Sequence, residues 1–275
     1  IALWGLFLVY LLSNRTFLMW TSSGLETAMF NFLIGFWIAV ILLPKKGRTN
    51  GFLLSGVATA IALTRPDGLL FCLATLIIIW VGRNNAGSSR PLVGSPLLSI
   101  APFSIVFIHL IWRHNLYGSW IPNTYYAKVS GMWPEAGVRY FASFVLEYGY
   151  WIPIPVIILA FIYTMNTWFR KKKTDGTVGC TASLWRGFAS RRCIYLILAT
   201  ALGIHAGYYT LIVGGDDFEY RVYSYFVRII FILFIYSLNQ LAIKRALSIF
   251  IIGLFMVVTL PVQWTHWMLT HNLNT

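Results

Sequence analysis

Acidic residues are scarce in this sequence, which has only 8 Asp and Glu side chains among 275 residues. Charged residues of both signs make up 11% of the chain, less than half of the share that a soluble domain usually carries. This shortage argues against a soluble enzyme. The rest of the composition agrees, because 58% of the residues are hydrophobic, 17% are aromatic and the mean hydropathy is +0.71. We therefore predict an integral membrane protein.

Cysteine is also rare, and the sequence lacks the usual patterns of metal and nucleotide ligands. Cys72 lies in an apolar run, and Cys180 and Cys193 flank a basic segment, so we interpret the three cysteines as free thiols. The five histidines lack metal-ligand spacing with one another, and there is no phosphate-binding loop, nucleotide fingerprint or GxSxG elbow. A soluble nucleotide-sugar site is therefore unsupported.

Long apolar runs dominate what is present. Runs such as Ile194 to Val213 and Ser248 to Val262 approach the roughly 20 residues that cross a bilayer, and they lack the two-residue alternation of a barrel strand. Because a chain in lipid must satisfy its own backbone hydrogen bonds, we predict an all-α fold, a polytopic transmembrane bundle of about eight to nine spans. The expected spans are residues 1–12, 27–43, 51–64, 69–82, 97–112, 150–169, 193–213, 225–243 and 246–264.

The net charge of +13 is explained better by loop position than by nucleic-acid binding. When alternate loops are assigned to opposite sides, most Lys and Arg residues fall on one side, which the positive-inside rule makes cytoplasmic. The acids on the other side are Glu26, Asp67, Glu135, Glu147, Asp216, Asp217 and Glu219. We therefore expect a multi-pass protein of the cytoplasmic membrane, with the lipid bilayer as a partner and no bound nucleic acid.

We expect one transmembrane domain over residues 1–275 with two long connecting segments. The segment 113–149 is expected outside, and the helical spacing of apolar residues from Pro134 to Leu146 predicts a helix lying on the outer leaflet. The segment 170–192 is basic and expected in the cytoplasm. The chain begins inside an apolar stretch without an initiator Met, which is typical of a fragment of a longer protein.

The strongest polar motif stands at the outer end of an apolar run. Three carboxylates, Asp216, Asp217 and Glu219, follow a pair of glycines, and Arg221 and Arg228 come after them. Carboxylates at a membrane boundary are unfavourable unless they are solvated, paired or bound to a ligand. Two interpretations remain open: a solvated loop whose acids pair with the two arginines, or the lining of a polar site.

Two further motifs contain charges close to the predicted membrane. Arg65 and Asp67 stand in a Pro- and Gly-containing turn between two short spans, where they either cap a helical hairpin or serve a function. Glu26 lies in the first turn of a predicted helix, where stabilisation by the helix dipole alone would explain it. For both motifs the structural and functional interpretations remain open.

The fourth motif lies in residues 113–128 and mixes cations, amides and aromatic rings. Aromatic rings such as Tyr125 cover the apolar faces of sugars, amides such as Asn123 bond hydroxyls, and Lys128 is suited to phosphate oxygens. The alternative is an ordinary aromatic belt with cations that reach toward the membrane surface.

Together these motifs carry a resemblance. In order along the chain they are Ser23-Gly24-Leu25-Glu26-Thr27, Arg65-Pro66-Asp67-Gly68, Tyr117-Gly118-x-x-Ile121-Pro122-Asn123-Thr124-x-x-Ala127-Lys128 and Gly214-Gly215-Asp216-x-Phe218-x-x-Arg221. The set resembles the bacterial membrane arabinofuranosyltransferases of the GT-C class of glycosyltransferases. The match extends over residues 22–221, although each motif is short.

The resemblance implies an enzyme that moves an arabinofuranosyl or similar sugar from a polyprenyl-phosphate donor to a cell-envelope glycan acceptor outside the cytoplasmic membrane. The substrate-binding residues that we then expect are Glu26, Arg65, Asp67, Asn123, Tyr125, Lys128, Asp216, Asp217, Arg221 and Arg228. Among these, Arg65, Lys128 and Arg221 are expected to contact the phosphate. No cofactor is assigned, and a role for a divalent metal is left open.

The catalytic base of the GT-C class generally lies in the first outer loop, and we expect this chain to start beyond that loop. The catalytic residue is therefore not assigned, and Asp216 and Glu26 are its candidates within this chain. The competing function is a transporter, flippase or motility-associated membrane factor without transfer chemistry. The gathering of polar residues on one side and the absence of an inverted repeat favour the enzyme.

Overall fold

The computed structural model describes residues 2–43, 50–84, 96–128, 131–174, 191–216 and 218–272. These residues form helices and turns and no strand, which confirms the all-α prediction. The chain groups into two compact units. Unit 1 comprises Ile1–Gly24, Pro134–Val178 and Gly214–Thr275, and unit 2 comprises Leu25–Trp133 and Gly179–Val213.

Unit 1 contains six helices among the residues described. They are α1 (Ala2–Ser13), α2 (Arg15–Ser22), α9 (Pro134–Glu147), α10 (Pro153–Thr174), α13 (Phe226–Gln240) and α14 (Arg245–Asn272). Helix α10 packs along α13, and α1 packs against both α13 and α14. In this core the ring of Tyr10 stacks on Phe231 with 4.1 Å between ring centroids.

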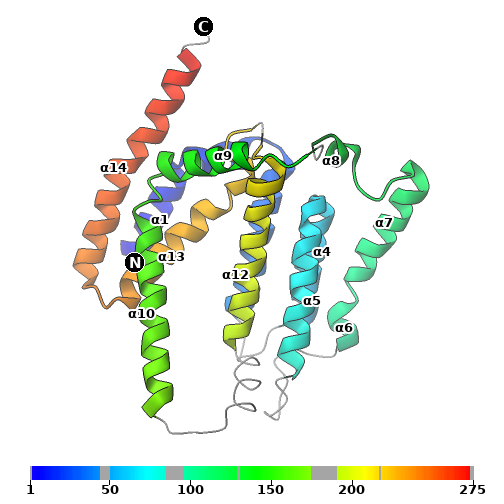
Figure 1. The fold of residues 1–275 in the computed structure, drawn as a ribbon, viewed down its shortest axis with the longest axis horizontal. Coiled ribbons are helices and arrows are strands. Elements are labelled where there is room, and N and C mark those ends of the chain that lie inside the picture. Colours follow the sequence, from blue (N-terminus) through cyan, green and yellow to red (C-terminus); the bar gives the residue numbers. More distant parts are fainter. Residues whose placement is uncertain are drawn as a thin grey trace. The chain divides into compact units, whose positions relative to one another are not determined.

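The turn between α9 and α10 changes the direction of the chain in unit 1. Helix α9 lies across the end of α10 (Figure 1). Gly149 in this turn has φ +64, and a Cβ atom there would lie 2.2 Å from Thr259 Cγ2 on α14. Only glycine suits both the left-handed backbone and the close approach. The turn therefore fixes how α9, α10 and α14 meet.

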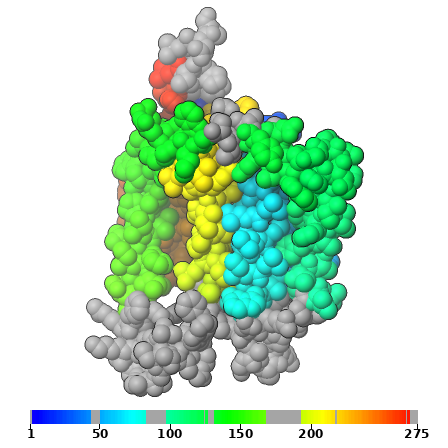
Figure 2. All heavy atoms as spheres, turned by 45° about the vertical axis from the view of Figure 1, so that its right-hand side comes forward, coloured from blue at the N-terminus to red at the C-terminus, as the bar shows by residue number. Residues whose placement is uncertain are grey.

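Unit 2 is built around a helical hairpin. Its described helices are α3 (Glu26–Leu42), α4 (Gly51–Thr64), α5 (Leu69–Asn84), α6 (Pro96–Ile100), α7 (Phe103–Tyr117), α8 (Asn123–Lys128) and α12 (Arg191–Gly207), which continues as a π-helical segment, Tyr208–Val213. Helices α4 and α5 pack together, α3 covers α4, and α12 packs on α5. Figure 2 shows the yellow α12 beside the cyan hairpin.

The turn of this hairpin is tight because of Gly68. A Cβ atom at Gly68 would lie 2.5 Å from the carbonyl oxygen of Ile61, closer than side chains approach backbone. Pro66 begins a short 3-10 turn there, and the chain then enters α5 directly. The turn therefore holds Arg65 and Asp67 at one end of the α4–α5 hairpin.

The number of membrane spans is smaller than the sequence predicted. Among the residues searched, three helices are long and apolar enough to cross a membrane: Cys193–Val213, Arg221–Gln240 and Arg245–His266. A fourth is gained if α1 and α2, bent by 66°, count as one broken span. The predicted eight to nine spans are therefore wrong. Within the residues searched, the other apolar helices are only 10 to 17 residues long, and 17 residues rise about 26 Å, short of a bilayer core of about 30 Å. They are Glu26–Leu42, Gly51–Thr64, Pro66–Gly82 and Pro153–Thr167.

The positions of the helices agree better with the sequence than the number of spans does. The predicted run 51–64 coincides with α4, and the predicted outer helix coincides with α9. The expected span 97–112 is instead divided into α6 and α7 at Pro102, because proline lacks the amide hydrogen and crowds the preceding turn. Most of the basic segment 170–192 lies outside the described residues.

Candidate functional site

The Asp67 cluster in unit 2 consists of Arg65, Asp67, His205 and Tyr209. The first two residues stand in the turn between α4 and α5, and the other two come from α12 and its π-helical continuation. His205 and Tyr209 are four residues apart, so they lie on the same face of that helix. Packing of α12 on α5 then brings this face to the charged turn.

All partners of the Asp67 carboxylate converge on one of its oxygens. Asp67 Oδ2 lies 3.0 Å from His205 Nε2, accepts a hydrogen bond of 2.7 Å from the Tyr209 hydroxyl, and is 3.3 Å from an Arg65 guanidinium nitrogen. The other oxygen, Oδ1, is buried and has no hydrogen-bond partner among the described residues. Such an unpaired buried acceptor costs about 1–3 kcal/mol, which native structures mostly avoid.

Both charges of the cluster are maintained despite burial. Burial by itself would raise the pKa of the Asp67 carboxyl, but the hydrogen bonds from His205 and Tyr209 and the charge of Arg65 hold that pKa below its usual range. Burial would lower the pKa of the Arg65 guanidinium, but Asp67, Tyr209 and the Glu26 carboxylate raise it. The site therefore presents an ionised carboxylate beside a guanidinium.

Aromatic rings enclose the Asp67 cluster. The Arg65 guanidinium carbon lies 4.9 Å from the centroid of the Phe30 ring. The imidazole of His205 lies 5.7 Å from the rings of both Phe30 and Phe71, and only 1% of the histidine is exposed. The Arg65 nitrogen that approaches Asp67 also donates a hydrogen bond of 2.6 Å to the Tyr209 hydroxyl. These contacts fix the orientation of the cluster.

The remaining site residues predicted for unit 2 differ in their exposure and in their contacts. Glu26, at the start of α3, is exposed, and its charge reaches Arg65. Tyr125 on α8 is hydrogen-bonded to Tyr208, the neighbour of Tyr209. Asn123 is exposed at the beginning of α8. The side chain of Lys128 lies outside the described residues.

In unit 1 an ion pair forms within the predicted acidic motif. Arg221 Nε lies 2.7 Å from Asp216 Oδ2, and only 1% of the Asp216 side chain is exposed. For Arg221, this pairing agrees with the interpretation in which the acids of the motif pair with its arginines. Arg228 differs, because its Nε and Nη2 atoms are buried without a hydrogen-bond partner in the residues described. Asp217 lies outside the described residues.

The loop that carries Asp216 is anchored to α9. Tyr140 donates a hydrogen bond of 2.8 Å to the carbonyl oxygen of Phe218, and a Cβ atom at Gly215 would lie 2.8 Å from the Tyr140 ring. Gly215 has φ +105, a conformation that favours glycine. Burial, and then the nearby Asp216 carboxylate, raise the pKa of the Tyr140 phenol. The phenol therefore remains a hydrogen-bond donor at neutral pH.

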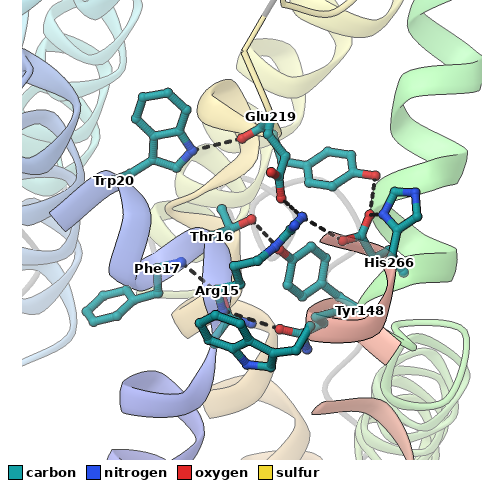
Figure 3. A network of polar contacts seen from close by, with 12 residues as sticks. Arg15, Thr16, Phe17, Trp20, Tyr148, Glu219 and His266 are labelled. Atoms are coloured by element: carbon teal, nitrogen blue, oxygen red, sulfur yellow. Dashed lines mark hydrogen bonds and ion pairs between the residues drawn. The ribbon is translucent and has the colours of Figure 1, made fainter. Parts of the chain in front are cut away.

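A second buried polar group in unit 1, the Arg15 cluster, was not predicted. It is centred on Arg15, which is hydrogen-bonded to the Glu219 carboxylate and, at 2.9 Å, to Glu147 Oε1 (Figure 3). Glu147 Oε2 accepts a hydrogen bond of 2.8 Å from Tyr220 and lies 3.2 Å from His266 Nδ1. Both oxygens of the Glu147 carboxylate are therefore occupied.

The Arg15 cluster binds separate parts of unit 1 together. Trp20 on α2 donates a hydrogen bond of 2.8 Å to the backbone oxygen of Glu219, and Thr16 is hydrogen-bonded to Tyr148 (Figure 3). Burial raises the pKa of the Tyr148 phenol to about 12. The Arg15 backbone also reaches Gln263 of α14 at 3.4 Å. The cluster thus joins α2, the end of α9, the loop before α13 and α14.

The partners in both clusters were not predicted from the sequence. The spacing of the histidines relative to one another gave no indication of a site, whereas His205 contacts an aspartate 138 positions away. A histidine inside an apolar run is itself a signal of a polar site, because such residues are rare in membrane helices. Arg15, three residues after the apolar run that ends at Leu12, was the corresponding signal in unit 1.

The arrangement of the described residues does not point to a metal centre or to a known relative. No group of three or more His, Cys, Asp or Glu side chains in the described ranges could hold a metal ion. Comparison of the chain with protein-family models, curated proteins and solved structures finds no match. The function must therefore be argued from the residues of the clusters themselves.

Proposed function

We propose that this protein is a membrane glycosyltransferase that moves a sugar from a polyprenyl-phosphate donor to a cell-envelope glycan on the outer side of the cytoplasmic membrane. The sugar is an arabinofuranosyl group or a close analogue. The proposal rests on the four motifs that resemble GT-C enzymes and on the chemistry of the Asp67 cluster.

Association with a bilayer is supported by the surface of the helices. Three described helices are long and apolar enough to span a membrane. Helix α7, which is shorter, exposes 70% of Phe107 and 65% of Ile108. Large exposed apolar surfaces are unfavourable in water and suit lipid. A lipid-linked donor would reach the protein from this environment.

The single observation that carries the proposal is the Asp67 cluster. An ionised carboxylate and a guanidinium lie together at the end of an apolar helical hairpin, and one carboxylate oxygen lacks a partner within the described part of the chain. Charged side chains in such surroundings are unfavourable and commonly mark functional sites. Sugar transfer from a lipid phosphate needs both types of group, an acceptor for a hydroxyl and a cation for the phosphate.

The residues near the cluster have the chemistry for these two tasks. The Arg65 guanidinium would neutralise phosphate charge that grows as the glycosidic bond breaks. Glu26 and the hydrogen-bonded pair of Tyr125 and Tyr208 would contact sugar hydroxyls.

Arg228 belongs to unit 1 and not to the Asp67 cluster. Its Nε and Nη2 atoms are buried without a hydrogen-bond partner in the described residues, and a guanidinium of this kind suits an anionic group.

A transporter or flippase is the second function, and one contact favours it. His205 lies in the candidate span Cys193–Val213 and contacts Asp67. Intramembrane His and Asp residues also form proton and ion pathways. The two functions differ in outcome, because a transporter moves its cargo across the membrane without making a new glycosidic bond.

The test is transfer of radiolabelled sugar from synthetic polyprenyl-phosphate donors to a membrane glycan acceptor by the purified intact protein in lipid vesicles. We expect a labelled glycan product with at least one donor, and loss of the product when the lipid phosphate is replaced by a neutral lipid ether. A protein that makes no product with any donor, but carries the labelled lipid across the vesicle membrane, would be a flippase.

A further inference from the structure

We propose that Asp67 is a catalytic residue, whose Oδ1 oxygen takes the proton of the acceptor hydroxyl while its Oδ2 oxygen is fixed by three partners, Arg65, His205 and Tyr209. This inference rests on the proposed sugar transfer and deepens it. It assigns the base to the turn between α4 and α5, whereas the resemblance implied a base in the first outer loop of the GT-C class.

The two oxygens of the Asp67 carboxylate have different surroundings. Guanidinium, imidazole and phenol all approach Oδ2, at 3.3, 3.0 and 2.7 Å. A carboxylate that only supported the fold would be expected to use both oxygens, because an unpaired buried acceptor is destabilising. A substrate hydroxyl that donates to Oδ1 would remove this penalty.

The two carboxylates named from the sequence as candidate bases are less suitable than Asp67. The Asp216 carboxylate is paired with Arg221 at 2.7 Å and its side chain is almost completely buried, so its charge is already neutralised within its own loop. Glu26 is exposed to solvent at the start of α3, where water would compete for its oxygens. Asp67 combines a fixed orientation, burial and an oxygen without a partner among the described residues.

His205 is then a positioning residue. Its Nε2 atom is engaged with Asp67 Oδ2, so this nitrogen does not face the substrate. The ring is buried between Phe30 and Phe71, which restricts its rotation. Because His205 holds Oδ2, it aims Oδ1 in one direction, as a supporting shell does in other active sites.

The proposed step balances without a further reactant. The lone pair of the acceptor hydroxyl forms a bond to the anomeric carbon of the donor, and the bond from that carbon to the phosphate oxygen breaks. Both electrons of the broken bond leave with the polyprenyl phosphate. The hydroxyl proton moves to Asp67 Oδ1, which becomes a neutral acid and later releases the proton to water.

The low proton affinity of Asp67 is compatible with this role. Hydrogen bonds from His205 and Tyr209 and the charge of Arg65 hold the pKa of the carboxyl below its usual range, despite burial. The carboxylate is therefore ionised and ready at neutral pH. The attacking oxygen becomes a strongly acidic oxonium as its bond to carbon forms, so even a weak base can accept the proton.

The test compares the parent with Asp67→Asn, which keeps the size of the side chain and removes its charge. We expect kcat for sugar transfer to fall at least about a hundredfold, with Kd for the donor changed less than about threefold. Glu135→Gln is the matched control, because Glu135 is an exposed acid on α9, and its rate should equal that of the parent. Loss of donor binding together with transfer would overturn the catalytic role and indicate a binding or structural one.

A rescue experiment separates chemistry from folding. In Asp67→Ala, added formate should restore part of the transfer rate, since a small carboxylate can occupy the place of the missing group and accept the proton. Formate should have no effect on the parent. Failure of formate to raise the rate of a variant that still binds the donor would contradict the assignment. Absence of transfer in the parent itself would refute the proposed function rather than this assignment alone.

His205→Leu, which removes the ring nitrogen that contacts Asp67 Oδ2, tests the positioning role through the pH profile. The charged and titratable groups around Asp67 are Arg65, His205 and Tyr209, with Glu26 acting on Arg65. Loss of a hydrogen bond that lowers the pKa of Asp67 should raise that pKa, so the acid limb of kcat/KM should move to higher pH. An unchanged acid limb, with only lower stability, would make His205 a purely structural residue.

Discussion

The Asp67 cluster and the Arg15 cluster are both buried ion pairs, but they use their carboxylates differently. In the Arg15 cluster both oxygens of Glu147 have partners, and Arg15 joins that carboxylate to Glu219. In the Asp67 cluster three partners share one oxygen, and the second is left without a partner in the described residues. The Arg15 cluster is not saturated at every atom, because Arg15 Nε and Gln263 Nε2 are buried without a hydrogen-bond partner in the described residues. For the carboxylates themselves, engagement of both oxygens is expected where the group holds the fold, and one open oxygen is expected where a ligand completes the site.

The two clusters also differ in what they connect. The Arg15 cluster joins four separate segments of unit 1, so its loss should loosen that whole unit. The Asp67 cluster joins one tight turn to one helix, and the hairpin below it is held by apolar packing as well. We therefore expect changes at Arg15 to affect stability most and changes at Asp67 to affect activity most.

The largest loss of stability should come from Arg15→Met. This change leaves the Glu147 and Glu219 carboxylates without their shared cation, and removal of one partner from a buried pair typically costs about 3–5 kcal/mol. Thermal unfolding in detergent, followed by tryptophan fluorescence, should show a correspondingly lower Tm. A Tm equal to that of the parent would show that the Arg15 cluster does not hold unit 1 together.

A smaller loss is expected from Gly68→Ala in the turn that carries Asp67. The added methyl group would meet the Ile61 carbonyl oxygen at 2.5 Å, and such overpacking costs about 1–3 kcal/mol. Because the turn must shift, the rate of sugar transfer should fall as well.

The matched control for that change is Gly56→Ala in α4. A Cβ atom at Gly56 meets nothing within 4 Å, and alanine is favoured over glycine in a helix by roughly 0.5–1 kcal/mol. This variant should be as stable as the parent or slightly more stable, with unchanged activity. Equal effects of the two substitutions would contradict the importance of the turn.

The smallest effect is expected from Arg139→Met on α9. Arg139 pairs with Glu135 at 2.6 Å, but 77% and 80% of the two side chains are exposed. Exposed pairs contribute at most about 1 kcal/mol. The variant therefore serves as the exposed counterpart of Arg15→Met, and the difference between their Tm values measures the effect of burial.

The sequence was informative about helices and less so about their length. The apolar run 51–64 predicted α4 correctly because a continuous run with a cap at Asn50 leaves few alternatives. The span count was wrong chiefly because several apolar runs form helices of only 10 to 17 residues, which are shorter than a membrane span. In addition, Pro102 divides the predicted span 97–112 into two helices.

The candidate site was predictable only in part, because local sequence patterns show contacts between near neighbours and not contacts between distant segments. Arg65 and Asp67 are neighbours in a turn, so their proximity follows from local geometry. The contact of Asp67 with His205 depends on the packing of α12 on α5, which local patterns do not contain. The pairing of Arg15 with Glu147 is equally distant in sequence, at 132 positions.

The most direct test of this comparison is to measure transfer rate and Tm together for Asp67→Asn and Glu147→Gln, the matched change from acid to amide in each cluster. The account predicts that Asp67→Asn loses at least about a hundredfold in kcat per folded molecule while most of its stability remains. It predicts that Glu147→Gln has a clearly lower Tm but transfers sugar at the parental rate per folded molecule. The reverse pattern, with transfer lost in Glu147→Gln and retained in Asp67→Asn, would contradict the account.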